Sequence, residues 1–183
     1  MLLARIDTET ERLDELIGRL LEYSRLDVES GEARMRVDVA DLIHAIVEDV
    51  RYEYADDAAE VILEAGSECF VHAHPGALRS CIENVIRNAM QHGGGEVLVR
   101  LSDEAGHAVL VVEDQGGGVA DDELGRIFEP FYRSTTTQAD QSRRSGGLGL
   151  AIASRAIAMH DGSIRASNTG SGLRVEIRLP LNG

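Results

Sequence analysis

The 183-residue chain contains no lysine and no tryptophan, and it has few cysteines and aromatic residues. Because all 18 basic residues are arginine, Schiff-base chemistry and a phosphate-binding loop built on lysine are excluded. The net charge of −14 argues against a nucleic-acid-binding protein, which needs a basic face for the phosphates. Three Phe and four Tyr are too few for a platform that stacks single-stranded bases.

Two further absences concern the cellular compartment. Cys69 and Cys81 are too few for the disulfide framework of a secreted protein, and their spacing fits no metal-binding pattern. No stretch approaches eighteen apolar residues, and no signal peptide opens the chain. We therefore expect a soluble, cytoplasmic polypeptide with one domain and a helical appendage.

The first 30 residues predict a long amphipathic helix, because apolar residues recur at steps of three and four with charged residues between them. Pairs such as Glu15–Arg19 would support this helix. Its apolar stripe needs a partner, so the helix either packs on its own domain or forms half of an interhelical bundle. The stripe consists of Leu2, Ile6, Leu13, Ile17 and Leu20, widened by Leu16, Leu21 and Leu26.

From about residue 33 the pattern changes to that of a mixed α/β domain. Asp41 is expected to cap a helix ending near residue 55, Pro75 opens a helix that stops at three glycines, and a third helix covers 148–159. Residues 134–147 are polar and locally basic, which predicts a mobile loop. Strands are expected over residues 35–39, 61–63, 69–71, 96–101, 108–112, 163–167 and 173–179. Antiparallel pairing is expected between 96–101 and 108–112, and between 163–167 and 173–179.

Two short blocks suggest a ligand site. Asn84 and Asn88 lie four residues apart, so both amides project from one helix face and could orient hydrated Mg²⁺ and polyphosphate without adding negative charge. Asp114 follows an apolar strand and precedes three glycines, so it could accept a hydrogen bond from a ligand amino group while the backbone approaches a flat ring. Taken alone, the first block is more often a solvated helix face and the second an ordinary turn.

Two further blocks lie nearer the C-terminus. Residues 145–152 form a glycine-rich helix start whose free N–H groups could bind an anion, although the block is neither a Walker A motif nor a Rossmann fingerprint. Phe128 and Phe131 flank a Glu-Pro pair beside the predicted loop. They could form the hinge of a lid, or merely a hydrophobic anchor for a surface loop.

Together and in this order, the Asn-x-x-x-Asn, Asp-x-Gly-x-Gly, Phe-Glu-Pro-Phe-Tyr-Arg and Gly-Gly-Leu-Gly-Leu blocks resemble the N, G1, F and G2 boxes of the histidine-kinase ATP-binding domain. The resemblance covers essentially the whole chain. Residues 172–180 look like the closing strand of that family, and residues 20–27 look like the second helix of its dimerisation and histidine-phosphotransfer hairpin. Within the family, the chain is similar to the CpxA-like envelope sensors.

The resemblance implies an α+β fold, a two-layer α/β sandwich of the Bergerat type with helices on one face of a mixed sheet, preceded by a long N-terminal helix. Residues 1–30 would be a truncated dimerisation and phosphotransfer helix. Residues 31–183 would be the ATP-binding catalytic domain, with a lid over about residues 133–147. The complete protein would transfer the γ-phosphoryl group of ATP to a histidine, and from there to an aspartate of a response regulator.

The same resemblance implies roles for individual residues. Asp114 would bind the adenine amino group, and Asn88 would hold Mg²⁺ against the phosphates of ATP or ADP with help from Asn84. Arginines of the lid could reach the triphosphate, and Asn84, Asn88 and Arg133 are the expected catalytic residues. The other expected nucleotide contacts and lid anchors are Gln91, His92, Gly116, Gly118, Phe128, Phe131, Arg143, Arg144, Gly147, Leu148, Gly149 and Leu150.

Three departures from the family pattern matter. Gln91 and His92 stand where many relatives have a basic residue and a Tyr, so one charge directed at the phosphates is missing or is replaced by an arginine of the lid. Ser145 stands where the glycine run usually begins with Gly. None of the six histidines belongs to a His-acid-x-x-Ser/Thr-Pro block, so the phosphoacceptor helix is expected upstream of residue 1.

The resemblance also implies partners: a nucleotide, a response-regulator receiver domain and the protein's own phosphotransfer hairpin, in a homodimeric sensor of the bacterial inner membrane. Nucleic acid is not expected. Two other functions stay open. ATPases like gyrase, Hsp90 and MutL activate water with a Glu four residues before the Mg²⁺-binding Asn, but that position here is Asn84, and Glu83 is rotated by about 100°. The other alternative is a catalytically silent interaction module whose pocket no longer binds nucleotide, because Gln91 and Ser145 depart from the family pattern.

Overall fold

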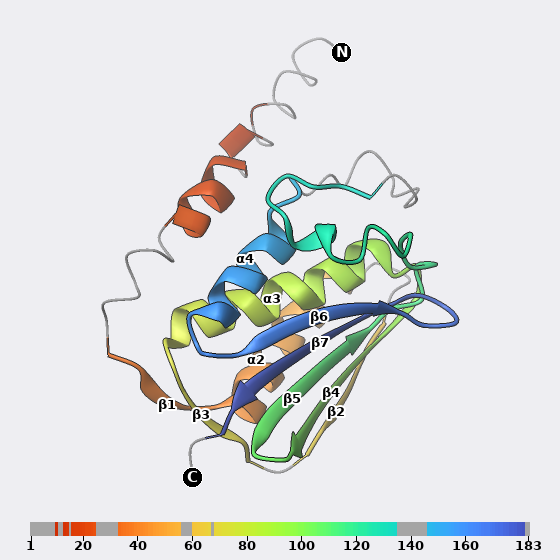
Figure 1. Cartoon of the computed structure of the whole chain (residues 1–183). Helices are drawn as coiled ribbons and strands as arrows, with labels where there is room; N and C mark the ends of the chain where they lie inside the picture. The colour runs from red at the N-terminus through yellow and green to blue at the C-terminus, as the bar shows by residue number, and fades with distance from the viewer. Residues whose placement is uncertain are drawn as a thin grey trace.

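The computed structural model describes residues 10, 13, 14, 16–24, 33–55, 60–66, 68–134 and 146–181. Residues 16–24 are helical and precede an α+β domain (Figure 1). No helix in these ranges is long and apolar enough to cross a membrane. The elements of the domain are β1 (Met35–Asp38), α2 (Val39–Glu53), β2 (Glu60–Ala65), β3 (Phe70–Ala73), α3 (Pro75–His92), β4 (Glu96–Glu104), β5 (His107–Glu113), the 3₁₀ turn η1 (Arg126–Phe128), α4 (Gly149–Ala158), β6 (Ser163–Asn168) and β7 (Leu173–Pro180).

The main sheet has five strands in the order β2-β4-β5-β7-β6. β2 pairs with β4 in parallel, because the chain crosses over through β3 and α3 between them, and the other three pairings are antiparallel. β1 and β3 form a separate antiparallel pair. Helices α2, α3 and α4 lie on one face of the main sheet (Figure 1), which confirms the predicted two-layer α+β architecture.

The core lies between the sheet and the helices. Alternate residues of the strands, such as Val97 and Val99 of β4 and Ile177 of β7, face the helix layer and are buried. Ile82 and Ile86, four residues apart on α3, are buried against them. Because the buried face of α3 is fixed in this way, its other face positions the two asparagines of the site.

The N-cap of α2 differs from the sequence prediction. Asp38 caps the helix, since its carboxylate accepts a hydrogen bond from the backbone N–H of Ala40 at 2.9 Å. The expected cap, Asp41, lies in the first turn instead, where its charge suits the helix dipole. The same Asp38 oxygen accepts a bond from the Cys69 N–H at 3.3 Å, so pairing between β1 and β3 selects the earlier aspartate.

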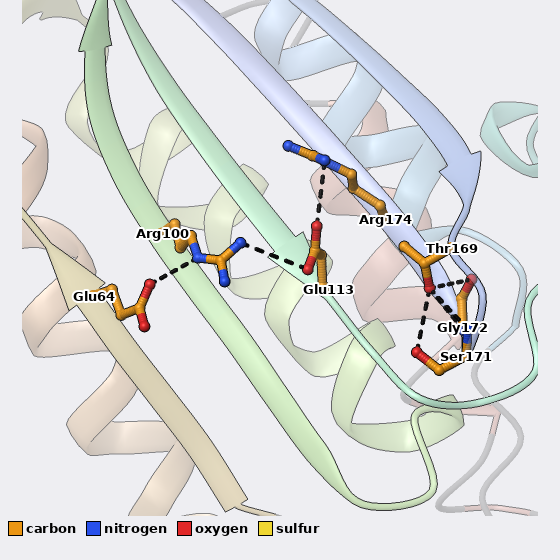
Figure 2. Close-up of polar contacts among 7 residues, drawn as sticks. All are labelled: Glu64, Arg100, Glu113, Thr169, Ser171, Gly172 and Arg174. Atoms are coloured by element: carbon orange, nitrogen blue, oxygen red, sulfur yellow. Dashed lines mark hydrogen bonds and ion pairs between the residues drawn. The ribbon is translucent and has the colours of Figure 1, made fainter.

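Charged side chains line the face of the sheet opposite the helices. Glu64 of β2, Arg100 of β4, Glu113 of β5 and Arg174 of β7 form a row of ion pairs with N–O distances of 2.7, 3.8 and 3.4 Å (Figure 2). Val111, which pairs with Arg100 across the β4–β5 ladder, is nevertheless only 6% exposed. This face is therefore covered by long charged side chains rather than by a second layer of helices.

The helical residues 16–24 use one face to pack on the domain. Glu22 accepts a hydrogen bond from the Ser80 hydroxyl of α3, and Tyr23 packs against the core. Outside this contact, Ile17 and Leu20 are 54% and 49% exposed. The two interpretations of the apolar stripe are thus compatible, because the helix contacts its own domain and still presents apolar residues to a further partner.

Candidate functional site

Asp114 is buried at the end of β5, with 6% of its surface exposed. Its Oδ1 accepts hydrogen bonds from the backbone N–H groups of Gly116 at 2.9 Å and Leu173 at 3.0 Å. No described residue donates a hydrogen bond to its other oxygen, Oδ2. The carboxylate is therefore fixed by one oxygen and can accept a hydrogen bond from a ligand through the other.

Close backbone contacts explain two glycines around this carboxylate. A Cβ at Gly116 would overlap the carbonyl oxygen of His92 at the end of α3, and a Cβ at Gly172 would overlap the carbonyl oxygen of Asp114. The strand end, the end of α3 and the β6–β7 turn can meet only because these side chains are absent. The sequence analysis selected Gly116 but missed Gly172, because the distance between the two segments in the chain gave no signal of their contact.

Asn168 is a second residue that the sequence analysis missed. Its Nδ2 donates to the carbonyl of Val119 at 2.7 Å and to the carboxylate of Asp121 at 2.9 Å, and its Oδ1 accepts from the Val119 N–H at 3.0 Å. A Cβ at Gly118 would overlap this Oδ1. Asn168 thus ties the glycine loop to the end of β6. A polar residue before a turn is too common to have identified it.

The two asparagines of α3 are both half-buried, and they differ in their hydrogen bonds. Asn84 donates from Nδ2 to the carbonyl of Ser80 at 2.9 Å, and its Oδ1 lies 3.1 Å from where a Cβ of Gly149 would be. The structure gives the Asn88 amide, one turn later, no partner among the described residues. Asn84 therefore lies against the start of α4, and the Asn88 carbonyl oxygen has its acceptor capacity left for a ligand or cation.

The start of α4 presents backbone N–H groups beside Asn84. Leu148 is fully buried and anchors this start, and as the N-cap residue it makes no side-chain capping hydrogen bond. The first N–H groups of a helix have no partner within it, and together with the helix dipole they favour an anion. The expected phosphate-end residues Gly147, Leu148, Gly149 and Leu150 therefore come together with Asn84.

A buried glutamate holds the segment that leads into the predicted lid. Glu123, 7% exposed, accepts hydrogen bonds from the hydroxyls of Tyr132 at 2.8 Å and Ser134 at 2.5 Å. Arg126 stacks over the Tyr132 ring at 4.4 Å. The sequence analysis missed Glu123, because a lone acidic residue in a polar stretch carries no distinguishing pattern.

The two phenylalanines beside this segment differ from each other. Phe128 packs against the core. The side chain of Phe131 is 60% exposed, and because most of the lid lies outside the described residues, the anchoring roles of both phenylalanines stay predictions. The backbone N–H of Phe131 donates to the carbonyl of Gly147 at 2.8 Å. The two ends of the predicted lid are joined there. Residues 135–145, with Arg143 and Arg144, lie outside the described residues.

His92 lies near enough to Asp114 and Arg133 for both charges to act on it. Burial lowers the pKa of its imidazole, Asp114 opposes that shift, and the positive charge of Arg133 adds to it. Its Nδ1 is buried without a hydrogen-bond partner in the described structure, while Gln91 is half-buried and Arg133 is exposed. A neutral His92 thus adds hydrogen-bonding capacity to the site without adding charge.

Comparison with known proteins agrees with this geometry. Residues 73–183 match the family described as histidine kinase-, DNA gyrase B- and HSP90-like ATPase. The chain is 32% identical over 183 residues to the sensor histidine kinase CpxA of Escherichia coli (strain K12), an alignment that covers 98% of this chain and 39% of that protein. The predicted similarity to CpxA-like sensors is thereby confirmed, and the chain spans well under half of this relative.

Two solved structures extend the comparison. A mycobacterial sensor histidine kinase, MprB, is 30% identical and superposes with a TM-score of 0.70, over 81% of this chain and 98% of that chain. Full-length ShkA in complex with AMPPNP is 28% identical and superposes with a TM-score of 0.78, over 93% of this chain and 36% of that chain.

Proposed function

Since the chain belongs to the histidine kinase-, DNA gyrase B- and HSP90-like ATPase family and is an ATP-binding domain of the sensor histidine kinase type, we propose that the site described above binds ATP or ADP together with Mg²⁺. We propose further that the intact protein transfers the γ-phosphoryl group to a histidine on a phosphotransfer helix outside this chain. A response-regulator receiver domain would then take the phosphoryl group onto an aspartate.

One observation carries the proposal. Asp114 is a buried carboxylate with one oxygen held by two backbone N–H groups and the other left to accept a hydrogen bond. An adenine amino group is a donor that fits this acceptor, and the surrounding glycine backbone allows a flat ring to approach. The start of α4, beside Asn84, supplies N–H groups for the phosphates of the same ligand.

The donor set also fits a magnesium ion. Mg²⁺ prefers oxygen ligands and usually keeps several waters, so one amide oxygen, that of Asn88, together with phosphate oxygens is a suitable set. When bound, the ion would neutralise charge on the phosphates. The residues of this chain would orient the nucleotide: Asp114 at the base, and Asn84 and the first turn of α4 at the phosphates.

The surroundings of Glu83 favour phosphoryl transfer over hydrolysis. A water-activating carboxylate would need to face the phosphates, but Glu83 forms an ion pair with Arg79 at 2.7 Å on its own helix. The helix position four residues before Asn88, where a hydrolytic enzyme would carry this carboxylate, is occupied by the neutral Asn84. A kinase domain of this kind would work with its own phosphotransfer hairpin in a homodimer. We propose that the intact protein is a bacterial inner-membrane sensor and that this domain lies on its cytoplasmic side.

Calorimetric titration with ATP and ADP in the presence of Mg²⁺ tests the proposed site. Asp114→Asn keeps the Oδ1 acceptor but replaces Oδ2 by a donor, so the fold should survive while affinity falls about tenfold or more. Asn88→Ala should also weaken binding, mainly when Mg²⁺ is present. Asp103→Asn, at an exposed position in the β4–β5 hairpin, is the matched control. Wild type without measurable binding, or both variants with unchanged affinity, would overturn the proposal.

A further inference from the structure

Residues 16–24 touch the domain at positions that surround the start of α4. The ring of Tyr23 lies 4.7 Å from the guanidinium of Arg155, on α4. A Cβ at Gly146, just before α4, would overlap the side chain of Leu16. Together with the hydrogen bond between Ser80 and Glu22, these contacts hold the helical segment across α3 and α4. The segment therefore borders the end of the site where the phosphates are expected.

Arg19 is the charged residue of this segment that the structure places beside the first residue of α4. Its Nη1 lies 3.7 Å from where a Cβ of Gly149 would be, and the same point is 3.1 Å from Oδ1 of Asn84. Three elements thus converge within a few ångströms: the N-terminal segment, α3 and the first residue of α4. Arg19 is half-buried, and its guanidinium lies beside Gly149.

The electrostatics of this convergence favour an anion. The first turn of a helix carries partial positive charge, and a guanidinium beside it adds a full positive charge, so both attract negative charge to the space between them. A phosphate accepts hydrogen bonds from both, and guanidinium is well suited to phosphate oxygens. Asn84 is a neutral amide, so it leaves this positive charge unchanged.

We propose that Arg19 is a phosphate-binding residue of the nucleotide site, supplied by the N-terminal helix and contacting the phosphates beyond the first. This inference rests on the proposed nucleotide site. The last turn of α3 offers Gln91 and a neutral His92 but no permanent positive charge, and Arg19 brings one to the phosphates from outside the four sequence boxes. Docking of the helix and binding of ATP are then linked, so each stabilises the other.

Calorimetry with ATP and AMP on the whole chain tests the inference. Arg19→Ala should weaken ATP binding about 10- to 100-fold, the effect of losing a charged hydrogen bond, and leave AMP affinity within about twofold. Arg19→Lys keeps the positive charge without the planar guanidinium, so its ATP affinity should lie between those of the wild type and Arg19→Ala. Arg165→Ala, which removes the same charge from an exposed position on β6, should change neither affinity.

The linkage gives a second readout. Tyr23→Ala removes the ring that lies against Arg155 of α4 and leaves Arg19 and Asn84 in place, so it should weaken ATP binding severalfold through helix docking and leave AMP binding unchanged. Equal losses for ATP and AMP in Arg19→Ala, unchanged ATP affinity, or tighter ATP binding would each overturn the inference while the proposed function stands. A wild-type chain that binds no ATP would overturn the proposed function itself, and this inference with it.

Discussion

The Nε2 atom of His160 accepts a hydrogen bond from the backbone N–H of His74 at 2.9 Å, while its Nδ1 lies 2.6 Å from the carbonyl of Ala156. The ring therefore carries its proton on Nδ1 and is neutral. Burial lowers the pKa of His160, the bond to Ala156 partly opposes this shift, and His74 and Arg34 add to it, with Asp161 acting against them. This buried imidazole ties the end of α4 to the start of α3.

We expect stability to fall in acid because of this ring. In the unfolded chain His160 takes up a proton near the ordinary pKa of 6.5, whereas in the folded chain its pKa is lower. The contribution of the neutral ring to the free energy of unfolding is therefore complete above pH 6.5 and is lost as the pH falls below that value. Urea unfolding at about pH 7.5 and about pH 5.5 measures the loss. His160→Gln should reduce the loss and cost about 1–2 kcal/mol at the higher pH.

His44→Gln provides the matched control, since His44 is exposed on α2. This variant should retain the full decrease in stability between the two pH values. An equal decrease in wild type and His160→Gln would contradict the prediction. The pKa of His92 is lowered as well, so the His160→Gln variant should still lose some stability between the two pH values, but less than the wild type.

Gly172→Ala should damage both the fold and the site. The added Cβ would overlap the carbonyl of Asp114, and backbone atoms on both sides must move, which costs about 1–3 kcal/mol. Gly170→Ala in the same turn is the control, because a Cβ added there would meet no atom within 4 Å and the φ of Gly170 is not in the left-handed region. Thermal unfolding and ATP titration should separate the two variants, and equal behaviour would refute the argument.

The exposed face of residues 16–24 and its extension at Leu13 should promote self-association. Leu13 and Leu20 are 58% and 49% exposed, and burying a large apolar side chain contributes about 1.5–3 kcal/mol. Sedimentation should show association that increases with concentration and is abolished by Leu13→Glu with Leu20→Glu, while ATP binding survives. Met35→Glu, at an equally exposed position on β1, should leave association unchanged. A strict monomer at high concentration would be contrary evidence.

Incubation with radiolabelled ATP should yield no acid-labile phosphohistidine on this chain. None of its six histidines has the acidic residue and Ser/Thr-Pro sequence expected of a phosphoacceptor. Two of them, His74 and His160, are also buried against each other. Label retained at alkaline pH and lost in acid would show that one of these histidines accepts phosphate.

Sequence periodicity was sufficient for most elements, because strands with one buried face alternate, and α3 begins at Pro75 and has Gly93 as its C-cap. Periodicity could not decide whether Asp38 or Asp41 caps α2, because both lie near the start of the same apolar pattern. Only the hydrogen bond to Cys69 distinguishes them. The parallel pairing of β2 with β4 likewise depends on where α3 packs, which no local pattern encodes.

The site was predictable where its residues fall in short blocks, marked by glycines at Asp114 and Gly149 and by the Asn-x-x-x-Asn spacing at Asn84. The residues that hold the site in place, Glu123 and Asn168, could not be predicted. They act through hydrogen bonds to segments 9 to 49 residues away, and each is an ordinary polar residue in its own neighbourhood. Arg19 was noted only as a helix-stabilising partner of Glu15. Its place beside α4 follows from tertiary packing alone.

The outer face of the sheet carries a third layer made only of side chains. Val109 and Val111 lie on this face, yet they are 2% and 6% exposed, and the residues paired with them on the neighbouring strands include Arg178 and Arg100. Every cation in the row of ion pairs is a guanidinium, which stays protonated even in alkaline solution, so the layer persists there. Another copy approaching this face meets alternating charge and not an apolar β-surface, and the open side of the fold is thereby protected against sheet-to-sheet aggregation.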